Sequence, residues 1–252
     1  MKIIISPAKK MVVDTDTYEV RGMPQYLENT KAILRQVREL SRDEAQALWK
    51  CNDKLTELNY GRFQRMDLEA CLTPALIAYE GLQYQHLAPG VLSVQALEYV
   101  QEHLRILSGF YGVLRPFDGV TPYRLEMQAR LSVDGRKDLY EYWGNRLYDS
   151  VAKGDGVIIN LASKEYSRCV EKYCGERDRF LTVEFCVLSE GRLRQKGTLA
   201  KMARGEMVRF LAENQVEEPE GMKDFKGLGF AYSKEHSQGD TWIFVKEEAL
   251  KG

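Results

Sequence analysis

The residues of this sequence that could take part in binding or catalysis are mainly basic. They follow apolar runs or stand in glycine-rich turns. They are Lys9, Lys10, Arg115, Arg124, Lys164, Lys201 and Arg204. Lysine and arginine on irregular backbone often contact phosphate groups. Tyrosines are interleaved with them, and Tyr111, Tyr123 and Tyr166 could stack on bases or sugars. The pattern therefore indicates a ligand that carries phosphate.

Glutamates near these basic residues leave other interpretations open. Glu80, Glu126 and Glu165 could neutralise the cations in a buried ion-pair network, or one of them could act as acid or base in an enzyme. The residues alone do not choose between a binding site, an ion-pair network and a catalytic site.

Several common kinds of active site are absent from the sequence. No glycine-rich nucleotide fingerprint follows a predicted strand, and no Walker lysine motif is present. The three histidines are scattered, and Cys169 and Cys174 have four residues between them, which is not the spacing of a zinc or iron-sulfur site. A serine-histidine-acid triad stays open, although no nucleophile-elbow pattern accompanies it. We therefore expect no cofactor and no bound metal.

The turn-rich stretch 106–127, ILSGFYGVLRPFDGVTPYRLEM, must position two of the basic residues. Its glycines allow close approach of another segment, and its prolines fix turns. Arg115 precedes Pro116 and Thr121 precedes Pro122, so both are pushed toward extended backbone. The stretch could carry binding groups, or it could be a core hairpin with structural glycines.

Strands are predicted at both ends of the chain and in its middle, with helices between them. Isoleucine-rich 2–5 and apolar 157–161 suit buried strands, the first ending at Ser6 and the second leading to a helix capped by Ser163. A short strand or buried segment is expected at 76–79, and hairpins are expected from 180–188 with 191–195 and from 228–232 with 241–245. Apolar periodicity predicts helices at 24–40, 93–104, 137–153 and 199–211. A further helix is predicted to begin at the capping box formed by Ser41 and Glu44. This mixture predicts an α+β (mixed α/β) fold with a central mixed sheet flanked by helices.

Residues 55–63 carry a helical pattern that is interrupted near Leu58-Asn59 and then resumes. A helix-hairpin-helix could contact a DNA phosphate with the amides of its second helix. Glu57 and Asn59 stand where many such hairpins have glycine, so the residues alone favour an ordinary helical hairpin.

Composition indicates an ordinary globular protein of 252 residues, 44% hydrophobic and 29% charged, and we expect one domain over residues 1–252. The net charge of −1 hides an uneven distribution, with six basic and two acidic residues between Glu190 and Arg209. Five irregularly spaced cysteines, the lack of a signal peptide and the lack of a long apolar run lead us to expect a cytoplasmic protein without a membrane segment.

Five segments in order along the chain resemble the peroxide stress protein YaaA family. They are SPAKKM (6–11), ALIAYEGLQY (75–84), ILSGFYGVLRPFDGVTPYRLEM (106–127), INLASKEY (159–166) and KMARGEMVRF (201–210). The resemblance implies a cytoplasmic bacterial protein that takes part in the response to hydrogen peroxide, limits free iron, and binds DNA through a positively charged cleft and a helix-hairpin-helix. By resemblance the hairpin lies at Leu55 to Phe63, which adds Asn59 and Arg62 to the nucleic-acid-binding residues.

The leading hypothesis is a monomeric, non-enzymatic protein that binds double-stranded or structured DNA. The seven basic residues would line its cleft, together with the polar and aromatic side chains of Ser6, Tyr111, Tyr123, Glu126 and Tyr166. The alternative is an enzyme acting on a nucleotide or nucleic acid, with Glu126 or Glu165 as proton carrier. Direct iron binding is disfavoured because clusters of histidine, cysteine or carboxylate are lacking, so an effect on iron would be indirect.

Overall fold

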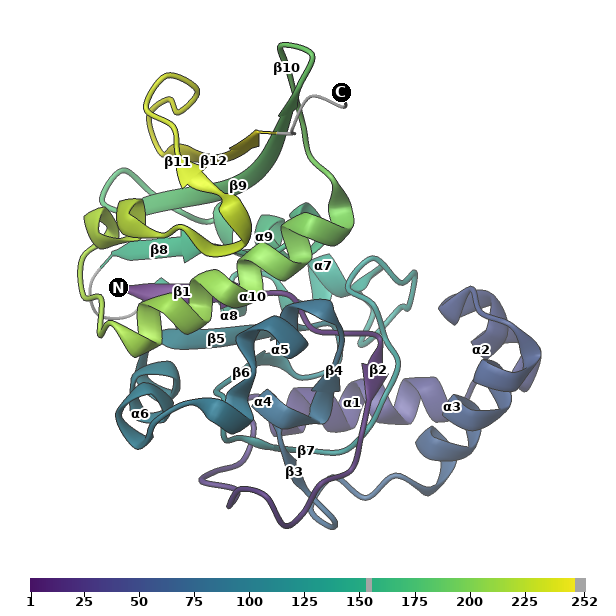
Figure 1. Cartoon of the computed structure of the whole chain (residues 1–252). Helices are drawn as coiled ribbons and strands as arrows, with labels where there is room; N and C mark the ends of the chain where they lie inside the picture. The colour runs from purple at the N-terminus through teal and green to yellow at the C-terminus, as the bar shows by residue number, and fades with distance from the viewer. Residues whose placement is uncertain (153–155, 248–252) are drawn as a thin grey trace.

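A mixed β-sheet runs through the centre of the computed structural model, which describes residues 1–152 and 156–247 (Figure 1). Its strands are β1 (Lys2–Ile5), β5 (Leu104–Ser108), β6 (Gly112–Leu114), β8 (Val157–Asn160), β9 (Arg179–Ser189), β10 (Arg192–Arg194), β11 (Ala231–Tyr232) and β12 (Thr241–Glu247). The order across the sheet is β11-β12-β9-β8-β1-β5-β6, and β10 pairs with β9. Neighbours from β5 to β12 are parallel, whereas β6, β10 and β11 are antiparallel to their partners. The predicted α+β fold with a central mixed sheet is confirmed.

The two strands at the middle of the sheet are those that the apolar runs predicted. Ile3, Ile4 and Ile5 of β1 and Ile158 and Ile159 of β8 have no exposed surface, as expected for parallel strands covered on both faces. After β1 the chain next enters the sheet as β5 on one side, whereas after β8 it enters as β9 on the other side. The carboxyl ends of β1 and β8 therefore lie side by side where the chain connections diverge, a place in α/β sheets where ligands bind.

Helices cover both faces of the sheet. They are α1 (Leu27–Arg38), α2 (Arg42–Trp49), α3 (Asp53–Arg65), α4 (Ala75–Ala78), α5 (Leu82–Leu87), α6 (Val94–His103), α7 (Leu139–Trp143), α8 (Arg146–Ala152), α9 (Lys164–Glu171) and α10 (Gly197–Glu213), with 3₁₀ turns at Pro89–Val91, Pro219–Asp224 and Gly227–Gly229. Figure 1 shows α10 crossing in front of the sheet and α8 and α9 behind it. Two short ladders, β2 (Lys10–Met11) with β4 (Tyr79–Glu80) and β3 (Thr73–Pro74) with β7 (Gly119–Val120), lie outside the main sheet. No helix in the described residues combines the length and the apolar character that crossing a membrane requires.

The predicted break near Leu58-Asn59 is wrong, because α3 is one continuous helix from Asp53 to Arg65. The reversal comes earlier, where Lys50 ends α2 in the left-handed conformation (φ 46°) and the Asn52 side chain caps α3 by accepting the N–H of Leu55. The capping box of Ser41 and Glu44 at the start of α2 is confirmed. Helices α2 and α3 thus form an ordinary helical hairpin, which projects at the right of Figure 1.

Other predicted elements are changed in detail. The expected helix 137–153 is split into α7 and α8 at Gly144, whose φ is 54°, and Lys153 lies outside the described residues. Residues 76–79 are mostly buried and mostly helical, since α4 ends at Ala78 and β4 begins at Tyr79. The hairpin of β9 and β10 and the hairpin of β11 and β12 are confirmed, although β11 is shorter than predicted.

The stretch 106–127 consists of two structurally different parts. Its first part is a buried hairpin of β5 and β6, in agreement with the interpretation of a core hairpin with structural glycines. Its last part, 121–127, is irregular and passes close to the β5–β6 turn. A Cβ on Gly109 would lie 2.8 Å from the carbonyl oxygen of Leu125, so glycine permits this approach. The hairpin therefore supports the segment that carries Arg124.

Candidate functional site

A pocket of about 420 Å³ opens at the carboxyl ends of β1 and β8. Segments far apart in the sequence line it: the loop after β1, the start of α5, the irregular segment 123–126, the start of α9, and α10. Its described lining residues include Ser6, Lys9, Lys10, Glu80, Gln83, Tyr84, Tyr123, Arg124, Glu126, Ser163, Glu165, Tyr166, Lys201 and Arg204. We call this the switch-point pocket. Among the lining residues that the structure describes, five are basic and three are glutamates.

Two serines join β1 and β8 at the base of the pocket. The Ser6 hydroxyl oxygen accepts the backbone N–H of Ser163 at 2.8 Å, and the two hydroxyl oxygens lie 3.2 Å apart. Ser163 occupies the N-cap position of α9, as predicted, but its side chain makes no capping hydrogen bond. The N–H groups of Lys164 and Glu165 also have no acceptor within residues 1–152 and 156–247. The start of α9 thus keeps uncapped donors at the pocket, an arrangement that suits an anion.

Two arginines line the pocket with donors that lack protein partners. The Nε atoms of Arg124 and Arg204 are buried and have no hydrogen-bond acceptor in the described part of the chain. Arg124 makes one weak ion pair, Nη2 to Glu126 Oε1 at 3.6 Å, and its side chain is 11% exposed. Burial lowers the pKa of Arg204, and attraction to Glu184 opposes that shift without forming a close ion pair. Buried guanidinium groups normally have hydrogen-bonded partners, so both arginines are incompletely satisfied.

Close packing of α10 against α5 brings Arg204 to the pocket. Gly205 faces α5, and a Cβ at this position would collide with the carbonyl oxygen of Gln83. The buried Nε2 of Gln83 also lacks an acceptor among the described residues. Gln83 is a site residue that the sequence did not single out, although it stands inside the motif ALIAYEGLQY.

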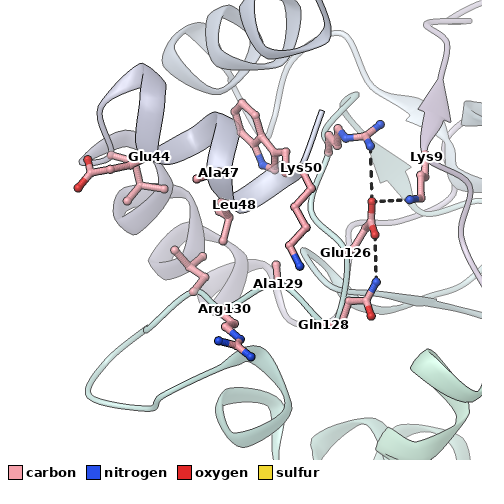
Figure 2. Close-up of a pocket in the computed structure, with 13 residues that line it drawn as sticks. Lys9, Glu44, Ala47, Leu48, Lys50, Glu126, Gln128, Ala129 and Arg130 are labelled. Carbon is pink, nitrogen blue, oxygen red and sulfur yellow. Dashed lines mark hydrogen bonds and ion pairs between the residues drawn. The ribbon is translucent and has the colours of Figure 1, made fainter. Parts of the chain in front are cut away.

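Glu126 is the point where several polar side chains meet (Figure 2). Its Oε1 pairs with Lys9 Nζ at 2.8 Å, and its Oε2 accepts Gln128 Nε2 at 3.4 Å. Lys10 pairs with Glu80 in the same way, at 2.8 Å. The charges of Lys9 and Lys10 are therefore partly neutralised, which agrees with the interpretation that the glutamates offset the basic residues.

Glu165 has a different environment from Glu126. Its Oε1 accepts the backbone N–H of Gln128 at 3.3 Å, and no close ion pair to it is present among the described residues. Burial raises the pKa of Glu165, and the charge of Glu126 adds to the shift, while Lys9 opposes it. The Glu126 carboxylate is thus paired with a lysine, whereas burial raises the pKa of the neighbouring Glu165 carboxyl.

A second pocket, of about 530 Å³, adjoins the first (Figure 2). Lys9, Arg124 and Glu126 line both pockets. Its other side is the α2 end of the helical hairpin, including Leu48, Trp49 and Lys50. The capping box of Ser41 and Glu44 predicted a helix at this place, but the sequence pattern did not indicate this pocket.

Tyrosines form the floor of the switch-point pocket. Tyr123 exchanges hydrogen bonds with Tyr79 (2.8 Å) and Ser108 (2.6 Å), and Tyr84 donates to the carbonyl oxygen of Ser6 (3.0 Å). Burial raises the pKa of Tyr79, Tyr84, Tyr123 and Tyr166, so these phenols stay protonated at neutral pH. Tyr123 and Tyr166 line the pocket.

Other predicted site residues lie elsewhere. Arg115 lines a different pocket with Arg105 and Asp118, and Lys164 is exposed and paired with Glu171 at 2.6 Å. Tyr111 is buried in the core, where its hydroxyl contacts Thr121, and Arg62 stands half-buried on α3. Asn59, which the resemblance placed among the nucleic-acid-binding residues, is 3% exposed, and its amide donates to the carbonyl of Leu55.

The residues of the pocket do not assemble a metal centre. Within the described part of the chain, no three His, Cys, Asp or Glu side chains gather in a way that could hold a metal ion. All five cysteines are free thiols.

Comparison with known proteins relates the whole chain to bacterial relatives. It is 51% identical over 249 residues to the UPF0246 protein of Agathobacter rectalis, covering 99% of this chain and 100% of the relative. The identity is 50% over 251 residues to the UPF0246 protein of Pediococcus pentosaceus and 48% over 251 residues to UPF0246 protein DSY0297 of Desulfitobacterium hafniense, each covering 100% of both chains. The family model described as peroxide stress protein YaaA matches residues 1–236. The chain therefore belongs to the peroxide stress protein YaaA family.

Proposed function

We propose that this protein binds double-stranded or structured DNA in the cellular response to hydrogen peroxide, through the switch-point pocket and the lysines around it. The family description supports the link to peroxide stress. The link to DNA rests on the chemistry of the pocket. Binding of this kind would protect DNA from oxidative damage by covering it.

The observation that carries the proposal is the pair of incompletely satisfied arginines, Arg124 and Arg204. Phosphate oxygens are acceptors that match guanidinium donors in charge and geometry. Lys10 and Lys201 lie exposed around the same pocket, where a DNA backbone could reach them. Ligand phosphates would meet the positive charge of the two guanidinium groups that line the pocket.

The α2–α3 hairpin is a weaker candidate for DNA contact. The start of α3 is already capped by Asn52, and it carries Asp53 and Glu57. Arg42 pairs with Asp53 at 2.9 Å and with Glu57 at 3.5 Å, so its charge is already offset. A phosphate at this helix end would meet two carboxylates, and the proposal therefore assigns the contact to the pocket.

Salt dependence tests the proposal. Affinity for a duplex should fall steeply between low and moderate salt, because each neutralised phosphate releases counterions. Arg124→Gln should weaken binding, whereas Arg115→Gln, the same charge change outside the pocket, should have a much smaller effect. Affinity that barely changes with salt, or equal loss in both variants, would remove the pocket from DNA binding.

A second candidate function is an enzyme acting on a nucleotide or nucleic acid. The observation that favours it is the contrast between Glu126, paired with Lys9, and Glu165, whose pKa is raised mainly by burial. Two neighbouring carboxyl groups in different environments can divide the roles of acid and base. Of the two proton carriers considered from the sequence, the environment favours Glu165 as the acid.

Turnover tests this second candidate. Pure protein should convert a labelled oligonucleotide or nucleotide, and Glu165→Gln should abolish turnover while leaving binding intact. Glu171→Gln, on the same helix outside the pocket, is the matched control. If the natural protein converts neither substrate under any tested condition, the enzyme hypothesis is rejected and DNA binding remains as the proposed function.

Cellular location and iron complete the proposal. We assign the protein to the cytoplasm, in keeping with its five free cysteines. A contribution to limiting free iron would be indirect, through the DNA-bound protein.

A further inference from the structure

The donors of the switch-point pocket differ in how far they lie from the surface. The side chains of Lys9 and Lys10 are 64% and 70% exposed, whereas the Nε atoms of Arg124 and Arg204 and the Nε2 atom of Gln83 are buried. A DNA duplex is too large to enter a pocket of about 420 Å³. Phosphodiesters running along the surface can reach the lysines, but only a small group that enters the pocket can approach the arginines.

The deep part of the pocket offers hydrogen-bond donors from three elements. Arg204 comes from α10, Arg124 from the segment after β7, and the uncapped N–H group of Glu165 from the start of α9. Phosphate groups bind at helix starts that follow the carboxyl ends of parallel strands, because the amides and the helix dipole favour negative charge there. The geometry thus combines an uncapped helix start with two guanidinium groups that lack close partners.

We propose that the switch-point pocket binds a terminal phosphate monoester, carried by the end of a DNA strand or by a free nucleotide. This inference rests on the proposed function, since it names the part of a nucleic acid that enters the same site. A monoester has three free oxygens and nearly two negative charges at neutral pH, whereas a phosphodiester has two free oxygens and one charge. The monoester therefore matches the larger number of donors better.

The acidic residues of the pocket set the orientation of this ligand. Glu126, Glu80 and Glu165 also line it, and an ionised carboxylate repels phosphate. Glu126 and Glu80 are each paired with a lysine, which reduces that repulsion. The phosphate is expected on the side of Arg204 and the start of α9. The remaining volume is large enough for the sugar of the terminal nucleotide.

A comparison of DNA ends tests the inference. Short duplexes that differ only in carrying 5′-phosphate, 3′-phosphate or hydroxyl ends are titrated with the natural protein and followed by fluorescence anisotropy. A phosphorylated end should bind about tenfold more tightly than a hydroxyl end, which corresponds to one charge-assisted hydrogen bond gained. In parallel, deoxyadenosine monophosphate and deoxyadenosine are tested as competitors, and only the phosphorylated form should compete.

A matched pair of variants locates the preference. Arg204→Gln should abolish the preference for phosphorylated ends. Arg209→Gln, on the same helix but paired with Glu213 at the surface, should keep it. The comparison of ends uses the natural protein, so it remains decisive even if Arg204→Gln fails to fold.

The outcomes separate this inference from the proposed function. Equal affinity for all three ends, together with a steep salt dependence, would overturn the terminal-phosphate inference and leave DNA binding in place. If the mononucleotide displaces a labelled nucleotide but the protein has no measurable affinity for any duplex, DNA binding is overturned. A free nucleotide would then be the source of the phosphate.

Discussion

Ser6 and Ser163, 157 positions apart in the sequence, are joined by a hydrogen bond from the backbone N–H of Ser163 to the Ser6 hydroxyl, 2.8 Å long. This bond connects the loop after β1 to the start of α9. It also draws the Ser163 hydroxyl toward Ser6, at 3.2 Å, and away from the capping role that its position would allow. The uncapped amides at the pocket follow from this arrangement.

Ser6→Ala should remove the acceptor for the Ser163 N–H and lower the free energy of unfolding by about 1 kcal/mol. Phosphate affinity should also fall, because the start of α9 loses its connection to β1. Ser163→Ala is the control, since it keeps the backbone donor and should cost less stability. Chemical denaturation of the three proteins measures the effect, and equal stability of wild type and Ser6→Ala would contradict it.

Arg124→Lys keeps the charge but removes the planar guanidinium. If Arg124 holds phosphate, DNA affinity should fall about tenfold while the melting temperature changes little, because lysine cannot make the same two-point contact. The ion pair to Glu126 is long, at 3.6 Å, so little stability depends on it. Arg115→Lys is the matched control. Unchanged affinity with a large drop in melting temperature would assign Arg124 to the scaffold.

Asp118 should make stability depend on pH. Burial raises its pKa to about 6, although the Arg115 N–H and the charges of Arg115 and Arg105 oppose the shift. The pKa of an aspartate carboxyl in the unfolded chain is ordinarily near 3.8, so the folded state binds more protons between these pH values. Stability from this group therefore falls as pH rises from about 4 to about 6 and stays low above that range.

Asp118→Asn should remove this contribution, so the free energy of unfolding should fall less between pH 4 and pH 6 than in the wild type. Asp14 provides a contrast, because hydrogen bonds from the Thr17 side chain and backbone lower its pKa. Its contribution is present at neutral pH and is lost on acidification, so Asp14→Asn should change the pH slope in the opposite sense. Denaturant titrations between pH 4 and pH 6 measure the slope of Asp118, and titrations below pH 4 measure that of Asp14. Parallel curves for Asp118→Asn and wild type would reject the assignment.

Gly205→Ala should destabilise the protein and disturb the pocket. A Cβ at this position would collide with the backbone carbonyl of Gln83, so α10 and α5 would have to separate, at a cost of about 1–3 kcal/mol. Gly197→Ala on the same helix meets open space and should be neutral or slightly stabilising, because alanine favours helix. Thermal melting compares the two variants. A Gly205→Ala protein as stable as the wild type would show that the two helices can move apart freely.

The local sequence determined several elements because the relevant forces act between neighbours in the chain. Continuous isoleucine and valine identified β1 and β8, and the capping box of Ser41 and Glu44 located the start of α2. Motifs spread over the chain indicated the family, which the full-length comparisons confirm. The break in the helix 137–153 was missed because apolar periodicity continues across Gly144, whose backbone with positive φ (54°) ends α7.

Only the tertiary structure decided which basic residues share a site. Arg115 and Arg124 are nine positions apart in one stretch, yet Arg115 follows β6, which is antiparallel to β5 and returns the chain to the amino end of that strand beside Arg105. Arg124 instead meets Lys9 and Arg204 at the carboxyl ends of β1 and β8. Strand direction sets this separation, and sequence distance does not reveal it. The unsatisfied donors of Arg124, Arg204 and Gln83 were equally hidden, because a missing partner is a property of the packed neighbourhood and not of the residue itself.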